Sequence, residues 1–313
     1  MPYPLPPTLS PSRVSAFTDC ALAYRFANLD KLPEPPSPHA TKGTLVHAAL
    51  ERLFAYDAAE RTPEVAAACL DRAAAAMLDD PEYAGLGLDD EASAVFVADA
   101  HRLLGKYLEM EDPRQVHAVG LELRVEAEVG GVTVRGIIDR LDRLPDGSFV
   151  VVDYKSGRSP SERYEKAKLL GVDTYALLIE RILGVRPVAV RLLYLGDGIA
   201  ITCIPSEQSS RFVEVKVGAI WQSIQRANVA DSFKPQPGKL CDWCAFQAWC
   251  PSFGGDPDEA RRLGEALRVE RHAAHAGAQG QTGTLTLLDE PLPLEPVESV
   301  EPVAGPPAAS AAG

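Results

Sequence analysis

Apolar residues recur at helical spacing through the first third of the chain. Ser10 and Pro11 are the residue types preferred at an N-cap and at the first helical position, so a helix is predicted from there to about Arg25. After a Pro-rich loop, residues 43–54 again place apolar side chains three and four positions apart, as on the buried face of a helix. Residues 58–112 are rich in Ala and Leu and interrupted by Pro and Gly, which predicts a helical insertion.

The middle of the chain changes to the alternating pattern of β-strands. Residues 121–129 alternate strictly between apolar and polar, and the pattern continues over 132–139 after a Gly-Gly turn. A second turn leads into residues 148–155, whose apolar centre and polar end are typical of a buried strand that delivers side chains to a site. These three segments are therefore predicted to form an antiparallel meander.

The rest of the chain combines both patterns. A helix is predicted over 161–183, a pair of strands over 187–195 and 198–204, and a second long helix over 206–226. Together these elements predict an α/β fold with a mixed central β-sheet flanked by helices, in one domain that spans residues 1–254.

Residues 255–313 are predicted to form an acidic tail rich in Pro and Ala. The tail starts with the pattern of a short helix, and from about residue 275 it lacks the residues to bury a core, which predicts disorder. It carries ten acids and four arginines, and so accounts for −6 of the net charge of −13. The remaining acidity argues against nucleic acid, but a site that gathers carboxylates around metal ions can still bind it.

Composition also bears on localisation. Hydrophobic residues make up 46% of the chain, yet no stretch approaches the roughly 18 apolar residues that a membrane span needs. The N-terminus lacks a signal-peptide pattern. A soluble, cytoplasmic protein with no membrane partner is expected.

Two acids and a lysine fall at the predicted strand ends. Asp139 ends one strand, and Asp153 and Lys155 end the strand that pairs with it. Period-two geometry places Asp153 and Lys155 on the same side of the sheet. The carboxylates can supply oxygen ligands for Mg²⁺ or Mn²⁺, and the lysine can position a water or stabilise negative charge during phosphodiester hydrolysis. Taken alone, Asp-x-Lys more often means a weak surface ion pair.

The wider arrangement favours the chemical interpretation. Gly-Thr-Leu-Val-His47, Gly-Ile-Ile-Asp139-Arg-Leu-Asp and Val-Val-Asp153-Tyr-Lys155-Ser-Gly follow one another in an order that resembles the RecB-like family of PD-(D/E)xK nucleases. The resemblance implies a restriction-endonuclease-like core, metal ligation by His47, Asp139, Asp153 and the Tyr154 carbonyl, and a catalytic Lys155.

Cysteines extend the resemblance. Cys241, Cys244 and Cys250 lie within ten residues, and without a signal peptide they suggest a metal or cluster rather than disulfides. The iron-sulfur branch of the family pairs such a trio with one N-terminal cysteine, which implies Cys20 as the fourth ligand of a [4Fe-4S] cluster. Structural zinc at the same four thiols is the alternative. Ala21 stands where the family often has Pro.

The resemblance also implies DNA contacts. The family has a Gln-x-x-x-Tyr helix after the metal motifs; here Tyr175 fits, and Gly171 occupies the Gln position. A phosphate could also bind at Ser10, Ser12 and Arg13, although helix capping explains the two serines equally well.

The implied function is a Mg²⁺- or Mn²⁺-dependent DNA exonuclease that acts on single-stranded ends in DNA repair or recombination. No Gly-x-x-x-x-Gly-Lys-Ser/Thr motif is present, so unwinding would need a helicase partner. One alternative is a catalytically weak iron-sulfur subunit that binds DNA for a helicase. A redox protein is another, but it leaves the Asp-Tyr-Lys strand unexplained.

Overall fold

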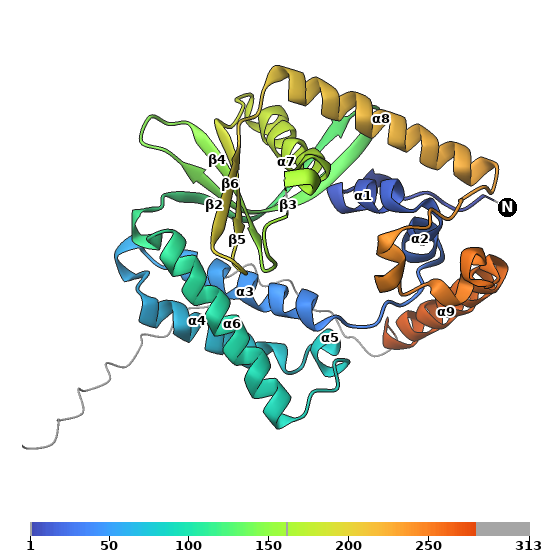
Figure 1. Ribbon diagram of the computed structural model, residues 1–313, viewed down its shortest axis with the longest axis horizontal. Coiled ribbons are helices and arrows are strands. Elements are labelled where there is room, and N and C mark those ends of the chain that lie inside the picture. The colour runs from blue at the N-terminus through green and yellow to red at the C-terminus, as the bar shows by residue number, and fades with distance from the viewer. Residues whose placement is uncertain (1, 161, 280–313) are drawn as a thin grey trace, which may run out of the picture. The chain divides into compact units, whose positions relative to one another are not determined.

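The protein folds around a mixed β-sheet with helices on both faces, as Figure 1 shows. The computed structural model describes residues 2–160 and 162–279. Contacts within the chain divide it into two units, Met1–Arg268 and Val269–Gly313, and the sheet lies in the first.

Six strands form this sheet: β1 (Thr8–Leu9), β2 (Ala118–Val129), β3 (Val132–Arg143), β4 (Phe149–Lys155), β5 (Ala189–Tyr194) and β6 (Ile199–Cys203). β2, β3 and β4 are consecutive antiparallel neighbours, which confirms the predicted meander. β3 does not end at Asp139 as predicted but continues to Arg143. β5 lies parallel to β4, and β6 returns antiparallel to β5 as predicted. The mixed α/β architecture is therefore confirmed.

Two groups of helices cover the sheet, one on each face (Figure 1). On one face lie α1 (Pro11–Asp19), α7 (Glu162–Leu183) and α8 (Glu207–Val229), and on the other α3 (Pro38–Phe54), α4 (Pro63–Met77) and α6 (Asp90–Met110), with the short α5 (Pro81–Ala84) between the last two. Val151 of β4 packs in the core between the sheet and α1, α7 and α8. Val150 and Val152 pack in the core between the sheet and α3, α4 and α6. Burial on both faces explains why β4 is apolar without alternation.

The helix predicted from Ser10 to about Arg25 is interrupted at Cys20. There the backbone is extended, with φ −160° and ψ 111°, and it ends α1 and starts α2 (Ala21–Tyr24). A π-helical turn, Arg25–Asp30, follows. Helix propensity does not reveal the break, because Cys20 caps the second helix with its own thiol, which accepts the backbone N–H of Ala23 at 3.5 Å.

α3 begins five residues earlier than predicted. Ser37 caps it by accepting the N–H of Ala40 at 3.4 Å, and Pro38 occupies the first turn. The Pro-rich composition of this segment concealed a Ser-Pro helix start. The extra turn brings His39 toward the loop after β4, within 3.5 Å of where a Cβ on Gly157 would lie.

The folded unit extends past the predicted boundary at residue 254. α9 (Pro257–Gln279) follows, and its first turns are packed: Ala260 is fully buried and Arg261 donates to the Tyr3 hydroxyl at 2.7 Å. Disorder was predicted from about residue 275, but residues 275–279 still belong to α9, so the prediction is wrong there. The rest of that segment, residues 280–313, lies outside the described part. No helix among the described residues has the length and apolar character to cross a membrane.

Arg140 of β3 is the largest fully buried side chain of the described residues. It forms a two-pronged pair with Asp142 at 2.8 and 2.9 Å, and donates to Glu111 at 2.6 Å and to the Tyr154 hydroxyl at 2.7 Å. Glu111 ends α6, so this cluster ties the helical insertion to the sheet. A buried charge of this kind is tolerated only while its partners stay in place.

Arg140→Leu is expected to lower the free energy of unfolding by about 3–5 kcal/mol, because Asp142 would stay buried without its partner and Glu111 would keep only its 3.5 Å ion pair with Arg191. Urea unfolding followed by circular dichroism measures the change. The control is Arg211→Leu on α8, whose 3.0 Å pair with Glu207 is solvent-exposed, and it should change stability by no more than about 0.5 kcal/mol. A loss below about 1 kcal/mol at Arg140 would contradict the structural role of the cluster.

Candidate metal-dependent active site

The candidate site lies where β4 separates from β3. Backbone pairing between the two strands ends at Arg140 opposite Val152. The next residue on each strand toward the opening is acidic, Asp139 and Asp153. The Asp139 carboxylate accepts the backbone N–H of Tyr154 at 2.7 Å and so replaces the missing strand partner. The sheet thus opens with two acids at the opening.

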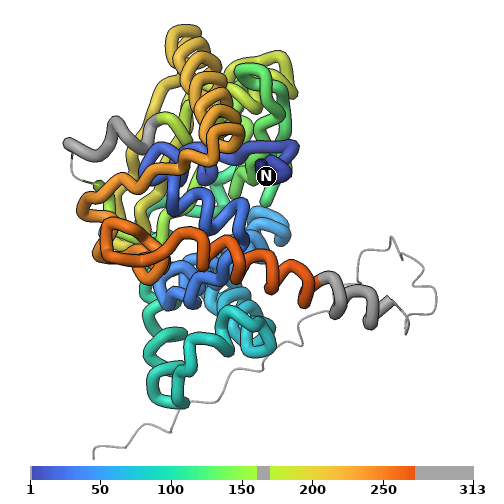
Figure 2. The backbone as a smooth tube through the Cα atoms, turned by 90° about the vertical axis from the view of Figure 1, so that its right-hand side faces the viewer, coloured from blue at the N-terminus to red at the C-terminus, as the bar shows by residue number. Residues whose placement is uncertain are grey.

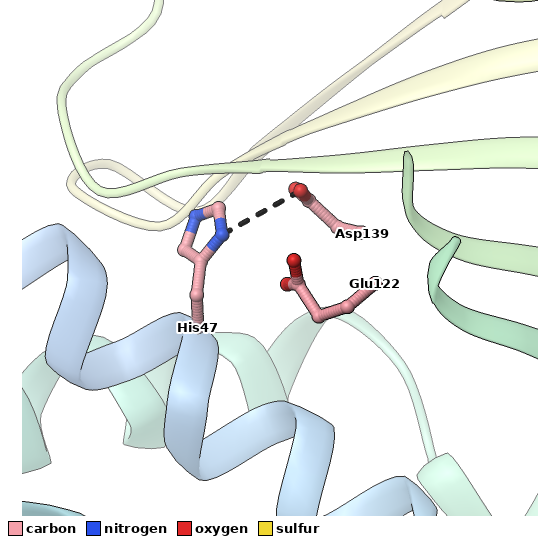
Figure 3. A group of neighbouring side chains, drawn as sticks. All are labelled: His47, Glu122 and Asp139. Carbon is pink, nitrogen blue, oxygen red and sulfur yellow. Dashed lines mark ion pairs between the residues drawn. The ribbon is translucent and has the colours of Figure 1, made fainter. Parts of the chain in front are cut away.

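Three side chains from three elements converge there, as Figure 3 shows. His47 comes from α3, Glu122 from β2 and Asp139 from β3, and one ligand atom of each lies within 4.8 Å of the others. Nδ1 of His47 is 3.6 Å from Oδ1 of Asp139. An imidazole with two carboxylates is a donor set that could hold a divalent ion such as Mg²⁺ or Mn²⁺.

His47 is oriented by the backbone of β4. Its Nε2 lies 3.1 Å from the Tyr154 carbonyl oxygen, so this nitrogen donates and Nδ1 faces the carboxylates. Ligand histidines in metal sites are commonly fixed in this way through their second nitrogen. Burial lowers the pKa of His47, but the carboxylates of Asp139, Asp153 and Glu122 together raise it by more, and the net shift is upward.

Glu122 is the site residue that the sequence prediction missed. The register of the hairpin could have identified it. Val129 pairs with Val132 across the Gly-Gly turn, and the same register continued along both strands puts Glu122 opposite Asp139. Glu122 adopts φ +43°, an uncommon backbone conformation for a residue with a side chain. Burial raises its pKa, and the facing Asp139 carboxylate adds to the rise.

Asp153 and Lys155 point to the same side of the sheet, as predicted, with Nζ of Lys155 2.5 Å from Oδ2 of Asp153. Asp153 lies at the same opening and is buried, with 8% of its surface exposed. It is not one of the three residues whose ligand atoms lie within 4.8 Å of one another. Burial raises the pKa of Asp153, and the lysine offsets only part of this rise. The lysine itself stays 42% exposed.

Tyr175 of α7 reaches the same region. A Cβ at Gly136 of β3 would lie 2.6 Å from the Tyr175 ring, so glycine is what allows the two to pack. Burial raises the pKa of Tyr175 to about 12, and the negative charges of Asp153 and Asp139 contribute. Gly171, one turn earlier, has no described atom within 4 Å of a Cβ placed there.

A cleft of about 780 Å³ leads to the site, between α3 on one side and the middle of β2 and the end of β4 on the other. His47, Glu122 and Lys155 line it. The predicted phosphate contacts at the start of α1 do not: Ser10 accepts the N–H of Arg13 at 3.2 Å and bonds Ser12 at 2.8 Å, while the Arg13 guanidinium donates to Thr8 and Asn28 at 3.1 Å.

The four predicted cysteine ligands come from two distant segments. Figure 2 shows the blue N-terminal helices beside the orange chain that follows α8, and the N–H of Leu22 donates to the Lys234 carbonyl at 3.2 Å. All four cysteines are half-buried and form no disulfide: Cys20, Cys241, Cys244 and Cys250. Burial raises the pKa of Cys244, and the other three thiols raise it further.

Comparison with known proteins gives three relationships. The sequence profile of the PD-(D/E)XK nuclease superfamily matches residues 8–251. The Gene 69 protein of Mycobacterium phage D29 is 24% identical over 284 aligned residues, which cover 79% of this chain and 97% of that protein. A candidate exonuclease from Eubacterium rectale, known from its crystal structure, has a TM-score of 0.52 at 14% identity over 76% of this chain and 87% of that one. At this identity the likeness concerns the fold.

Glu122→Gln should have opposite effects on stability with and without Mn²⁺. Because the pKa of Glu122 is raised in the folded state, this group makes the metal-free protein less stable as pH rises through that pKa and more stable as pH falls through it. Near pH 8 in EDTA, the variant should therefore melt at a higher temperature than the wild type.

With Mn²⁺ at about 100 times its Kd, the wild type should gain about 2.7 kcal/mol, and the variant should lose most of this gain with its ligand oxygen. Differential scanning fluorimetry follows both effects. Glu126→Gln, an exposed position on the same strand whose carboxylate pairs with Arg135 at 2.7 Å, should respond to Mn²⁺ like the wild type. An undiminished response in Glu122→Gln would exclude this carboxylate from the metal site.

Proposed function

This chain belongs to the PD-(D/E)XK nuclease superfamily, and from that membership we propose that it is a Mg²⁺- or Mn²⁺-dependent DNA exonuclease that digests single-stranded ends in DNA repair or recombination. One observation carries the proposal. The imidazole and carboxylates of His47, Glu122 and Asp139 meet beside the Asp153–Lys155 pair at the opened end of the sheet.

Phosphodiester hydrolysis needs a nucleophilic water, neutralised charge in the transition state and a stabilised leaving oxygen. A bound divalent ion would supply a more acidic water and positive charge at the phosphate. In our proposal His47, Glu122 and Asp139 hold the ion, and Asp153 and the Tyr154 carbonyl add oxygen donors on the β4 side.

Lys155 acts in the proposal on the water and on the developing negative charge. Its ammonium is half-exposed in the cleft and steadied by Asp153 at 2.5 Å. It can donate a hydrogen bond to the attacking water or to a phosphate oxygen. A fixed cation at that place stabilises the transition state more than the ground state, because the charge on the phosphate grows as the reaction proceeds.

The size of the cleft favours a single strand. A volume of about 780 Å³ is in the range of small-molecule sites, which suits a few unpaired nucleotides better than a duplex. Tyr175 is proposed to contact the backbone near the cleaved phosphate. Ser10, Ser12 and Arg13 lie outside the cleft and would serve, at most, a distant part of the strand. Duplex DNA would need a helicase partner.

We also propose a [4Fe-4S] cluster at Cys20, Cys241, Cys244 and Cys250. Two of these sulfurs already accept backbone N–H groups, Cys20 from Ala23 at 3.5 Å and Cys241 from Gly238 at 3.4 Å, which is how proteins commonly support cluster thiolates. The cluster would join chain segments on either side of the catalytic core.

The spacing of the cysteines along the chain favours the cluster over zinc. Structural zinc sites commonly pair two short Cys-x2-Cys segments. This sequence has one such segment, Cys241–Cys244, with Cys250 shortly after it and Cys20 far ahead of it.

Lys155→Ala should reduce the rate of shortening of end-labelled single-stranded DNA in Mn²⁺ by about 10²–10³-fold, because one preorganised charge at the reacting phosphate is lost. Initial rates resolved on denaturing gels measure the effect. Lys216→Ala on α8 removes a lysine outside the cleft and should retain the wild-type rate. A wild-type protein that binds DNA but never cuts it would overturn the exonuclease proposal in favour of a helicase-associated binding subunit.

Protein purified without oxygen should contain about four irons and four sulfides per chain, and Cys20→Ser should lose most of both. Metal and sulfide analysis with visible absorption spectroscopy tests this. Cys69→Ser changes a buried thiol on α4, away from the four, and should keep the full content. One zinc per chain with no sulfide would decide for the zinc alternative.

A further inference from the structure

Two arginines line the cleft from opposite sides of β3. Arg124 lies on β2, two residues beyond Glu122, and Arg158 lies in the loop after β4, three residues beyond Lys155. Both are exposed, and no described residue gives either one a hydrogen bond or an ion pair. Most arginines in the described structure do have such partners, for example Arg135 with Glu126 and Arg186 with Glu180.

The backbone at Arg158 is held on both sides. The Gly157 carbonyl accepts the N–H of Gly196 at 3.1 Å, and the N–H and hydroxyl of Ser159 both donate to the Asp197 carboxylate, the hydroxyl at 2.7 Å. Asp197 therefore bonds Ser159 rather than Arg158. Because the backbone on both sides of Arg158 is hydrogen-bonded, the loop holds the Arg158 side chain at the cleft.

Acids outnumber basic groups in the rest of the site. Glu51 and Glu122 line the cleft, and Asp139 and Asp153 lie at the opening of the sheet, with Lys155 paired to Asp153. A polyanion would be attracted by the two arginines and repelled by these four carboxylates unless a metal cation were bound among them. The charges therefore follow the pattern required by one strand whose central phosphate sits on the metal site.

We propose that Arg124 and Arg158 bind the phosphates on either side of the cleaved one, and so fix the path of a single strand from β2 across β3 to the loop after β4. β2 and β4 lie on opposite sides of β3, so two strand spacings of about 4.8 Å separate them where the strands are paired, and the opening of β3 from β4 adds to this distance. The backbones that carry the two arginines are thus farther apart than the rise of about 3.4 Å per stacked nucleotide, which lets the two guanidiniums contact different phosphates. This inference rests on the proposed nuclease function and assigns its substrate contacts.

Binding is measured by fluorescence anisotropy with a labelled single-stranded oligonucleotide in Mn²⁺, using Lys155→Ala protein to suppress cleavage. Adding Arg124→Ala or Arg158→Ala should each weaken binding about tenfold and reduce the steepness of its salt dependence by about 0.7 in log–log slope. Arg211→Ala removes an equal charge outside the cleft and should do neither.

Neutral methylphosphonates, placed one at a time along the oligonucleotide, locate each contact. Binding should weaken at one position on each side of the cleaved phosphate. Arg124→Ala should abolish the sensitivity at one of them and Arg158→Ala the sensitivity at the other. Once the arginine is removed, neutralising the phosphate that it contacts has no further effect on binding. Uniform sensitivity in both variants, wild-type affinity in both, or absence of any binding would overturn the inference.

The two proposals can fail separately. If wild-type protein cuts DNA while the arginine variants bind and cut like it, the phosphate contacts are wrong and the nuclease stands. If wild-type protein does not cut but the methylphosphonate pattern depends on the arginines as stated, the strand path stands and the exonuclease function fails.

Discussion

The separation of β3 from β4 beyond Arg140 and Val152 is the constraint on which the site depends. Continued pairing would use the backbone N–H and C=O of Tyr154 within the sheet. Instead, the Asp139 carboxylate accepts that N–H at 2.7 Å, and Nε2 of His47 donates to that carbonyl at 3.1 Å. Buried backbone groups need partners, so the two side chains that satisfy Tyr154 are also the ones that its backbone fixes in place.

Tyr154 is held at its other end by the buried arginine. Its hydroxyl accepts from Arg140, which is anchored by Asp142 of the same strand and by Glu111 at the end of α6. The residue is therefore fixed through both backbone and side chain, and the insertion takes part through Glu111. The buried cluster around Arg140 thus sets, through Tyr154, the orientation of His47 and Asp139, as outer contacts do in metal sites.

The sequence predicted most of the fold because its signals are local. Alternation, the Gly-Gly turn and the apolar run of β4 were sufficient for the meander, and the orientation of Asp153 toward Lys155 followed from strand geometry. The break at Cys20 could not be predicted, since it depends on a cap supplied by the thiol itself. Glu122 was missed for another reason. A polar residue at this position fits the alternating pattern of an ordinary strand, and only the register across the hairpin shows that Glu122 faces Asp139.

Electrostatics reconcile the acidic chain with a polyanionic substrate. Burial, and repulsion from Asp139, raise the pKa values of Glu122 and Asp153, so the space beside these carboxylates is a poor place for a phosphate until a cation binds. Arg124 and Arg158 supply positive charge on either side of it. Metal and strand would therefore each increase the affinity of the other by the same factor, as linkage requires. The net charge of −13 is therefore compatible with DNA binding, because the potential along the cleft depends on Arg124, Arg158, Lys155 and a metal ion rather than on the sum over the chain.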